Sequence, residues 1–309
     1  MTVLPDAAPA NWVDRYAPPA MRPWLKLGRF DRPVGIWLLM LPGWQGIALA
    51  DAARGHWPNP LLLIAFAIGA ALMRAAGCAY NDIVDRDIDA RIARTAGRPI
   101  ASGQISPKQA AVFILICSLI SLFILLTLGL VAIALGVGSL ALVAAYPFMK
   151  RITWWPQAWL GITFNWGALL GYAAATHTLR LPALLLYAGG ICWTLGYDTI
   201  YAIQDIEDDA LVGVKSSARR LGPRARWGVA AFYIACVILT LGAADLAGLG
   251  PLFLPFAGLF ALHLSWQASR VDPADPVGAL ALFRSNRDAG LVLFAGLAAG
   301  LWPGATGGL

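Results

Sequence analysis

Long apolar stretches alternate with short polar ones along most of the chain. Nine apolar segments can be drawn, near residues 33–51, 60–80, 108–127, 129–147, 156–176, 181–201, 226–245, 248–266 and 287–302. Most of them approach the roughly 20 residues that a helix needs to cross the hydrocarbon core of a bilayer. Because lipid cannot satisfy an open backbone, each segment is expected to be helical. The pattern therefore predicts an all-α integral membrane protein with nine transmembrane helices.

Charged residues are scarce and are concentrated between the apolar segments. The chain of 309 residues is 59% hydrophobic and 13% charged, whereas soluble domains carry about 25% charged residues. The first thirty residues lack the apolar core of a signal peptide, because five prolines interrupt them. We therefore expect a flexible or interfacial N-terminal arm over residues 1–22, followed by a single transmembrane domain over residues 23–309.

Lysine and arginine are distributed unevenly between the two ends of the predicted helices. Twenty of them fall on the side of the N-terminus, only Arg54 and Arg180 fall on the other side, and Arg74 lies within the second segment. This asymmetry follows the positive-inside rule, so the N-terminal side is predicted to be cytoplasmic. The net charge of +6 is explained by this topology and requires no nucleic-acid partner.

Two polar loops on the basic side, residues 81–107 and 202–225, carry acidic clusters. The first cluster opens as NDIVDRDID over residues 81–89, and the second runs over residues 198–209; we call them cluster one and cluster two. An offset of 120 residues superposes Asp85 on Asp205 and Asp89 on Asp209. The chain is therefore predicted to consist of two pseudo-repeated halves that face one another, with a site where they meet.

Nine of the 17 acidic residues lie in these clusters: Asp82, Asp85, Asp87, Asp89, Asp198, Asp205, Glu207, Asp208 and Asp209. A spacing of four places Asn81, Asp85 and Asp89 on one face if the second helix continues. Carboxylates without Cys or His nearby suit Mg²⁺, which is commonly held by carboxylates together with substrate phosphates. The pattern indicates Mg²⁺-dependent binding of a diphosphate, with Arg94, Arg98, Lys215 and Arg219 as further counter-ions. The alternative is a solvated loop stabilised by its own ion pairs.

Arg74 is the one basic residue inside a predicted transmembrane helix. It precedes Asn81 by seven residues, so both point to the same helix face. A charge within a membrane is costly, which favours a role in lining a polar cavity. The alternative is that its side chain reaches back to the membrane surface.

Five stretches carry a specific pattern: LGRFDRPVGIWLLMLPGWQG (27–46), MRAAGCAYND (73–82), NDIVDRDIDARIARTAGRPIASG (81–103), YPFMKRITWWPQ (146–157) and GYDTIYAIQDIEDDALVGVKS (196–216). They resemble the UbiA superfamily of intramembrane prenyltransferases, and within it the bacterial enzymes that prenylate 4-hydroxybenzoate. The resemblance implies nine helices around a central cavity, with both clusters at its cytoplasmic mouth in a bacterial inner membrane. It implies transfer of a polyprenyl group from its diphosphate to 4-hydroxybenzoate, ortho to the hydroxyl, in ubiquinone biosynthesis.

The resemblance also implies roles for individual residues. The first Mg²⁺ would be bound by Asn81, Asp82, Asp85 and Asp89, and the second by Asp205 and Asp209 with support from Asp198 and Asp208. The diphosphate would contact Lys150, Arg151 and Lys215. Arg74 or Arg32 would hold the benzoate carboxylate. Aromatic rings could shelter an allylic carbocation; the candidates are Tyr146, Tyr197, Tyr201 and Trp166, each with core packing as the alternative.

Two other functions remain open at this point. A related enzyme could use another acceptor, such as haem, a naphthoate, a homogentisate or a chlorin. A carrier of a divalent cation or a phosphorylated solute would also combine repeats with charged residues in the membrane. Clustering of the acidic residues at one face, rather than along a path, favours the enzyme. No cofactor other than Mg²⁺ is expected.

Overall fold

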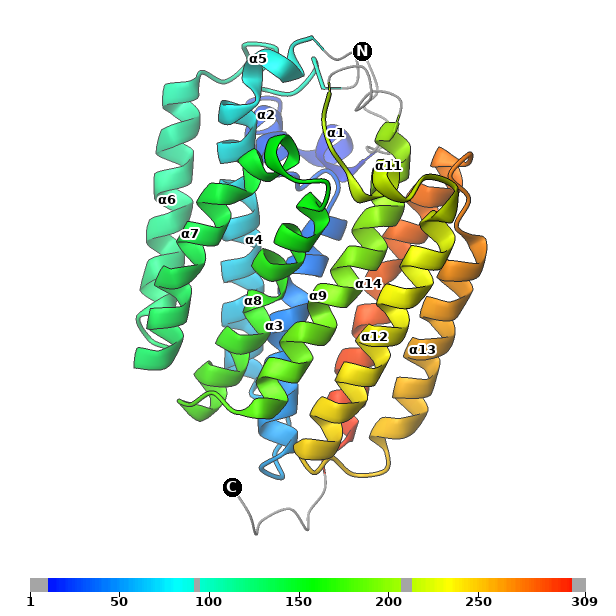
Figure 1. The fold of residues 1–309 in the computed structure, drawn as a ribbon. Coiled ribbons are helices and arrows are strands. Elements are labelled where there is room, and N and C mark those ends of the chain that lie inside the picture. The colour runs from blue at the N-terminus through cyan, green and yellow to red at the C-terminus, as the bar shows by residue number, and fades with distance from the viewer. Residues whose placement is uncertain (1–10, 92–94, 207–212, 302–309) are drawn as a thin grey trace. The chain divides into compact units, whose positions relative to one another are not determined.

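A computed structural model of the chain describes residues 11–91, 95–206 and 213–301 (Figure 1). Within these ranges every regular element is a helix and no strand occurs. The chain forms two compact units: unit one comprises residues 1–37 and 67–127, and unit two comprises residues 38–66 and 128–309. The predicted all-α class is confirmed in the described residues.

Unit one contains three short helices, two long ones and the first residues of a third long helix. Its helices are α1 (Trp12–Tyr16), α2 (Arg22–Leu27), the start of α3 (Val34–Ala52), most of α4 (Pro60–Val84), α5 (Arg86–Asp89) and α6 (Pro107–Leu125). Ser106 and Gln109 begin α6 with a reciprocal capping box. Leu27 and Ala79 share a buried apolar cluster with Ile105, so α2 packs against α4 and the segment that leads into α6.

The predicted N-terminal arm is partly described. Asn11 caps α1, and its side-chain oxygen accepts a hydrogen bond from the backbone N–H of Asp14. The indole of Trp12 donates to the carbonyl oxygen of Phe30 at 2.7 Å, and Val13 is fully buried. Residues 11–22 are thus attached to unit one, whereas residues 1–10 lie outside the described part.

Unit two contains the remaining long helices. They are the rest of α3, then α7 (Leu130–Ile152), α8 (Pro156–Thr176), α9 (Leu181–Tyr201), α12 (Ala225–Leu246), α13 (Phe253–Arg270) and α14 (Pro276–Ala299), with the short elements η1 (Ala202–Asp205), α11 (Ser217–Leu221) and η2 (Gly222–Arg224). Within this unit α9 packs along α8, α12 and α14. Helix α13 packs against both α12 and α14.

Small residues and buried amides hold these helices together. A Cβ on Gly46 would collide with the carbonyl oxygen of Ala168, so α3 and α8 touch through their backbones. Asn286 on α14 accepts from the indole of Trp193 at 2.8 Å and donates to Gln267, which also accepts from the hydroxyl of Tyr233 at 2.5 Å. Close small-residue contacts and interhelical polar bonds are typical of packing in membranes, where apolar burial drives little association.

Nine helices in the described residues are 18 residues or longer, and each overlaps one predicted apolar segment. By length and composition alone, five helices can cross a membrane: α3, α4, α6, α7 and the stretch Ser217–Leu246. Several apolar side chains on them are exposed, as Phe123 (71%) and Leu130 (81%) illustrate. These five helices are therefore long and apolar enough to lie in a membrane.

The last helix differs from its prediction. Helix α14 begins at Pro276, whereas the apolar segment was expected to begin near residue 287. Polar residues 284–287 interrupt the apolar run but not the helix. Ser285 and Asn286 direct their side chains to α13 instead, where His263 and Gln267 are their partners. Apolar patterning cannot detect a helix turn whose polar side chains are paired inside the protein.

Candidate functional site

Cluster one forms the end of α4 and the short helix α5 in unit one. The backbone N–H of Asp85 donates to Asn81 at 2.9 Å, and that of Asp89 donates to Asp85 at 2.8 Å. The predicted spacing by helical turns is therefore present. Asp82, Asp85 and Asp89 are buried at 1%, 1% and 5% exposure, so cluster one is not a solvated loop.

Two arginines bind the carboxylates of cluster one. Arg29 donates through Nη2 to both oxygens of Asp82, at 2.6 and 2.9 Å, and through Nη1 to the carbonyl of Lys26. Arg98 donates through Nη1 to Asp89 at 2.7 Å and lies 3.3 Å from Asp82. Asp82 is therefore an ion-pair partner of two guanidinium groups, and Asp89 is a partner of one of them.

Arg29 has an unusual backbone. Its φ is 60°, in the left-handed region that few residues other than Gly, Asn and Asp adopt. The residue is 9% exposed and lies between α2 and α3. Sequence reasoning included Arg29 in a resembling stretch but missed its role, because its partner Asp82 is 53 residues away.

The buried charges shift each other's protonation equilibria. Burial alone would lower the pKa of Arg29, but the charge of Asp82 and its hydrogen bonds raise that pKa above the ordinary value. Burial raises the pKa of Asp89, an effect that the nearby Arg98 opposes and the charges of Asp82 and Asp85 reinforce. Arg29 is therefore held in its charged form, whereas burial and the neighbouring carboxylates disfavour ionisation of Asp89.

Arg74 lies in unit one on α4 and packs against the start of α3. Its Nε and Nη2 atoms are 2.9 Å from the position that a Cβ on Gly35 would occupy. The other predicted carboxylate binder, Arg32, donates to Asp31 at 3.3 Å. Because Gly35 has no side chain, the Arg74 guanidinium can lie close to the start of α3.

Cluster two lies where α9 ends in unit two. The α-helix α9 ends at Tyr201, and the 3₁₀ turn η1 follows it directly. Asp198, Tyr201 and Asp205 are half-buried, and the ring of Tyr201 packs on Phe283 with centroids 4.5 Å apart. The predicted residues Asp208 and Asp209 lie outside the described residues.

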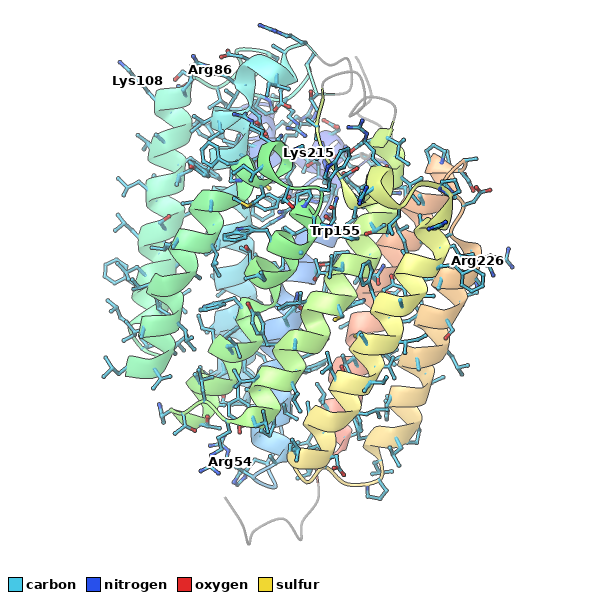
Figure 2. All side chains as sticks on the ribbon, in the orientation of Figure 1. Arg54, Arg86, Lys108, Trp155, Lys215 and Arg226 are labelled. Atoms are coloured by element: carbon cyan, nitrogen blue, oxygen red, sulfur yellow. The ribbon has the colours of Figure 1, made fainter. Side chains whose placement is uncertain are left out.

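Basic residues of α7 and of the segment after cluster two meet in unit two. The backbone N–H of Lys215 donates to the carbonyl of Lys150 at 3.1 Å, and its Nζ donates to the carbonyl of Ile152 at 3.1 Å. Arg151 is exposed and lies 6.0 Å from the ring centre of Phe148 on its own helix. Lys215 lies at one end of this unit, and Arg54 lies at the other (Figure 2).

Neutral hydrogen bonds fix the segment that carries Lys215. The backbone N–H of Ser217 donates to the side-chain oxygen of Gln157 at 3.0 Å. The hydroxyls of Thr199 and Ser217 lie 2.6 Å apart. Gln157, Thr199 and Ser217 are all buried, so these bonds connect the start of α8, the end of α9 and α11.

The aromatic candidates separate into two groups. Tyr197 is 1% exposed and packs edge-on against Trp193, and Trp166 donates to the carbonyl of Leu135 at 2.8 Å. Tyr197 is thus part of the core, whereas Trp166 is half-buried. Tyr146 and Tyr201 are half-buried and remain candidates for shielding a cation.

The donor set fits Mg²⁺ better than a transition metal. Among the residues that the structure describes, no group of three or more His, Cys, Asp or Glu side chains forms a metal cage. Mg²⁺ needs no such cage, because it is usually bound by one or two carboxylates together with waters and substrate phosphates. Asn81, Asp85 and Asp89 supply oxygen donors of this type without a thiol or imidazole.

Comparison with curated proteins identifies similar chains of known activity. The chain is 46% identical over 292 residues to the mitochondrial 4-hydroxybenzoate polyprenyltransferase of Homo sapiens, covering 93% of this chain and 77% of that protein. It is 42% identical over 292 residues to the enzyme of the same name from Arabidopsis thaliana, covering 94% and 72%.

These relatives correct one prediction. A bacterial inner membrane, with the N-terminus and both Asp-rich loops in the cytoplasm, was expected, but the relatives just named are mitochondrial proteins. The prediction of that compartment is wrong. The count of basic residues distinguishes the two sides of a membrane but does not identify the membrane.

Solved structures and a family profile agree with the curated relatives. The structure resembles the apo UbiA homologue from Aeropyrum pernix K1 with a TM-score of 0.71 and 29% identity, covering 84% of this chain and 96% of that one. It also shares the fold of a UbiA homologue from Archaeoglobus fulgidus bound to GPP and Mg²⁺, with a TM-score of 0.67, 19% identity and coverage of 90% and 99%. The profile of the UbiA prenyltransferase family matches residues 39–299. This chain therefore belongs to the UbiA prenyltransferase family.

Proposed function

We propose that this protein transfers a polyprenyl group from polyprenyl diphosphate to 4-hydroxybenzoate, with Mg²⁺, in ubiquinone biosynthesis. The new bond forms at the ring carbon ortho to the hydroxyl, and diphosphate is released. The main support for the proposal is sequence identity to relatives named 4-hydroxybenzoate polyprenyltransferase. This identity is 41–46% over more than nine-tenths of this chain. The solved homologue bound to GPP and Mg²⁺ supports the choice of donor and metal.

The donor diphosphate is bound by the acidic clusters. Asn81, Asp85 and Asp89 would hold one Mg²⁺, and Asp205 and Asp209 would hold another, with Asp198 and Asp208 in support. Bound there, Mg²⁺ would supply positive charge against the leaving diphosphate. Asp82 contributes indirectly, because its two arginine partners fix the end of α4 from which the ligands project.

Cations beside the diphosphate complete its neutralisation. Lys150 and Lys215 are brought together by the backbone bond between them, and we assign both to the diphosphate oxygens, with Arg151 as an outer counter-ion. Positive charge aimed at the leaving group stabilises the transition state more than the ground state. These residues therefore contribute mainly to turnover.

The acceptor is oriented by Arg74. A guanidinium presents two parallel N–H donors that match a carboxylate, and the fixed orientation brings the ortho carbon toward the donor. We choose Arg74 over Arg32 because Arg74 lies on α4 seven residues before the proposed ligand Asn81 and thus on the same helix face. The closeness of Arg74 to Gly35 supports this choice, since it limits the orientations open to the guanidinium.

The reaction exchanges one bond for another. The allylic C–O bond breaks and its electron pair leaves with the diphosphate. The electron-rich ring carbon forms the new C–C bond, and the ring proton leaves. Tyr146 and Tyr201 present aromatic faces that stabilise the intermediate cation. Exclusion of water prevents hydrolysis of that cation.

We further propose that all nine long helices cross the membrane around a central cavity. Helices α8, α9, α13 and α14 add to the five that qualify by composition. They carry buried polar residues such as Asn165 and Thr194, which lower their mean hydropathy without exposing charge to lipid. With nine crossings, both Asp-rich loops lie on the side that holds twenty of the basic residues.

A membrane assay tests the proposal directly. Purified protein in bilayers is given labelled geranyl diphosphate and 4-hydroxybenzoate, with Mg²⁺ or with EDTA. The expected result is prenylated hydroxybenzoate that forms only with Mg²⁺. A haem or naphthoate acceptor tested in parallel distinguishes a related enzyme, and metal uptake without any product would identify a carrier instead.

A further inference from the structure

A groove runs between α12 and α13 in unit two. Its volume is about 360 Å³, within the roughly 300–1,000 Å³ typical of small-molecule sites. Ala230 on α12 and Ala261 and Ala268 on α13 line it, so short side chains leave the space open. Tyr233 and Leu264 are the deeply buried part of its lining, at 3% and 1% exposure.

One end of this groove is basic. Arg226, in the first turn of α12, is the one charged side chain among the described lining residues. Its guanidinium carbon lies 5.8 Å from the ring centre of Trp227, which also lines the groove and is 71% exposed. Figure 2 shows Arg226 projecting from the outer edge of unit two. Arginine beside an exposed tryptophan is typical of the interface between membrane and water.

The remainder of the groove is apolar. Ile234 and Ile238, one helical turn apart on α12, line it at 61% and 62% exposure. They belong to the stretch Ser217–Leu246, which is long and apolar enough to cross a membrane. The hydroxyls of Ser265 and Ser269 donate to carbonyls of their own helix. The groove therefore combines one cationic end with an exposed apolar part.

We propose that this groove binds one anionic phospholipid. The phosphate lies at Arg226, the interfacial part of the lipid contacts Trp227, and one acyl chain lies along Ile234 and Ile238. The inference is independent of the proposed catalytic activity, because none of these residues belongs to the acidic clusters or their basic partners.

The charge around the basic end favours an anionic headgroup over a zwitterionic one. Arg224 and Arg270 are exposed and close in sequence to Arg226 and Ser269. The nearby Asp272 directs a carboxylate oxygen to the backbone N–H of Ala274 at 2.9 Å. A headgroup with its own ammonium would be repelled by the arginines, whereas one with net negative charge would not. Each such basic residue contributes on the order of 1 kcal/mol at an anionic membrane surface.

Native mass spectrometry of the full chain in a neutral detergent tests the proposal. The protein is titrated with phosphatidylglycerol and, separately, with phosphatidylcholine of the same acyl chains. We expect one phosphatidylglycerol to bind in preference. Arg226→Gln should weaken its binding about fivefold, which corresponds to the loss of one arginine, and weaken phosphatidylcholine less, because its ammonium already opposes the arginines. Ala230→Phe fills the groove and should weaken both lipids.

Arg220→Gln is the matched control, since it removes an exposed arginine near the same end that does not line the groove. Equal losses in Arg220→Gln and Arg226→Gln would mean diffuse attraction and overturn the site. Unchanged binding in both Arg226→Gln and Ala230→Phe would overturn it as well. So would competition by geranyl diphosphate, or a dimer that Ala230→Phe dissociates, because each would assign the groove to another occupant. Thermal unfolding of every variant verifies that it is folded.

Discussion

The two acidic clusters are related in sequence but are held in place by different kinds of bonds. In cluster one, charged groups bind each other: Arg29 and Arg98 donate to Asp82 and Asp89. In the segment that follows cluster two, buried neutral groups of Gln157, Thr199 and Ser217 bind each other, and the Lys215 ammonium donates to the carbonyl of Ile152. Both scaffolds position the end of a long helix, α4 in one case and α9 in the other.

This difference predicts how strongly each scaffold responds to mutation. Breaking a buried ion pair leaves an uncompensated charge, at a cost of about 3–5 kcal/mol. Leaving a buried neutral group without its partner costs about 1–3 kcal/mol. Cluster one should therefore respond to mutation of its scaffold more strongly than cluster two, although both should lose activity when a proposed metal ligand is removed.

The strongest effect is expected at the metal ligands. Asp85→Ala and Asp205→Ala should each reduce turnover by about 1,000-fold, the upper range for loss of one strong electrostatic contact in an active site. Membrane insertion should be unchanged. The assay is product formation from labelled geranyl diphosphate, with expression level and proteolysis pattern as controls. Near-normal turnover in either variant would refute its ligand role.

Arg29→Gln should destabilise the protein by about 3–5 kcal/mol, because Asp82 would remain buried beside Arg98 alone. Unfolding in mixed micelles measures the change. The double variant Arg29→Gln/Asp82→Asn should recover part of the loss, since both charges are removed together. If the double variant is no more stable than the single one, the ion pair is not the cause.

Gln157→Leu should destabilise unit two by about 1–3 kcal/mol, because the buried N–H of Ser217 would lose its acceptor. The same unfolding measurement applies. A loss as large as that of Arg29→Gln would contradict the contrast between the two scaffolds. Turnover should fall less than in Asp205→Ala, since Lys215 is displaced but not removed.

Gly35→Ala tests the placement of Arg74. The new Cβ would lie 2.9 Å from the guanidinium, so the flexible arginine side chain must move by several tenths of an ångström. We expect KM for 4-hydroxybenzoate to rise several-fold, corresponding to about 1 kcal/mol of lost binding, with KM for the prenyl donor unchanged. An equal rise for both substrates would argue against Arg74 as the carboxylate partner.

The exposed pair Asp14–Lys26 should contribute least. Its side chains are 39% and 35% exposed and 2.7 Å apart, so Asp14→Asn should cost at most about 1 kcal/mol. The hydrogen bond from Lys26 lowers the pKa of Asp14. The contribution is thus present above the ordinary carboxyl pKa and is lost as pH falls through the lowered value. Unfolding at pH 7 and pH 3, with and without salt, measures it.

The membrane helices and the spacing of the clusters were predictable because both depend on local sequence. Apolar runs of about 20 residues specify helices in lipid, and α4, α7 and α12 follow their predicted segments closely. The spacing of Asn81, Asp85 and Asp89 survives because α4 and α5 continue the same helical turns. The start of α14 was not predicted correctly, because polar residues that are paired inside the protein interrupt the apolar run there.

The partners of the charged residues were decided by tertiary structure. The bonds from Arg29 to Asp82 and from Lys215 to Lys150 join residues 53 and 65 positions apart, and no periodicity relates such positions. Gly35 became informative only once Arg74 was seen against it. Local sequence thus determined which segments are helical and which donors are available, because those depend on hydrogen bonds and burial within one segment. Only the folded chain determined which charges neutralise one another, because that depends on which helix ends meet.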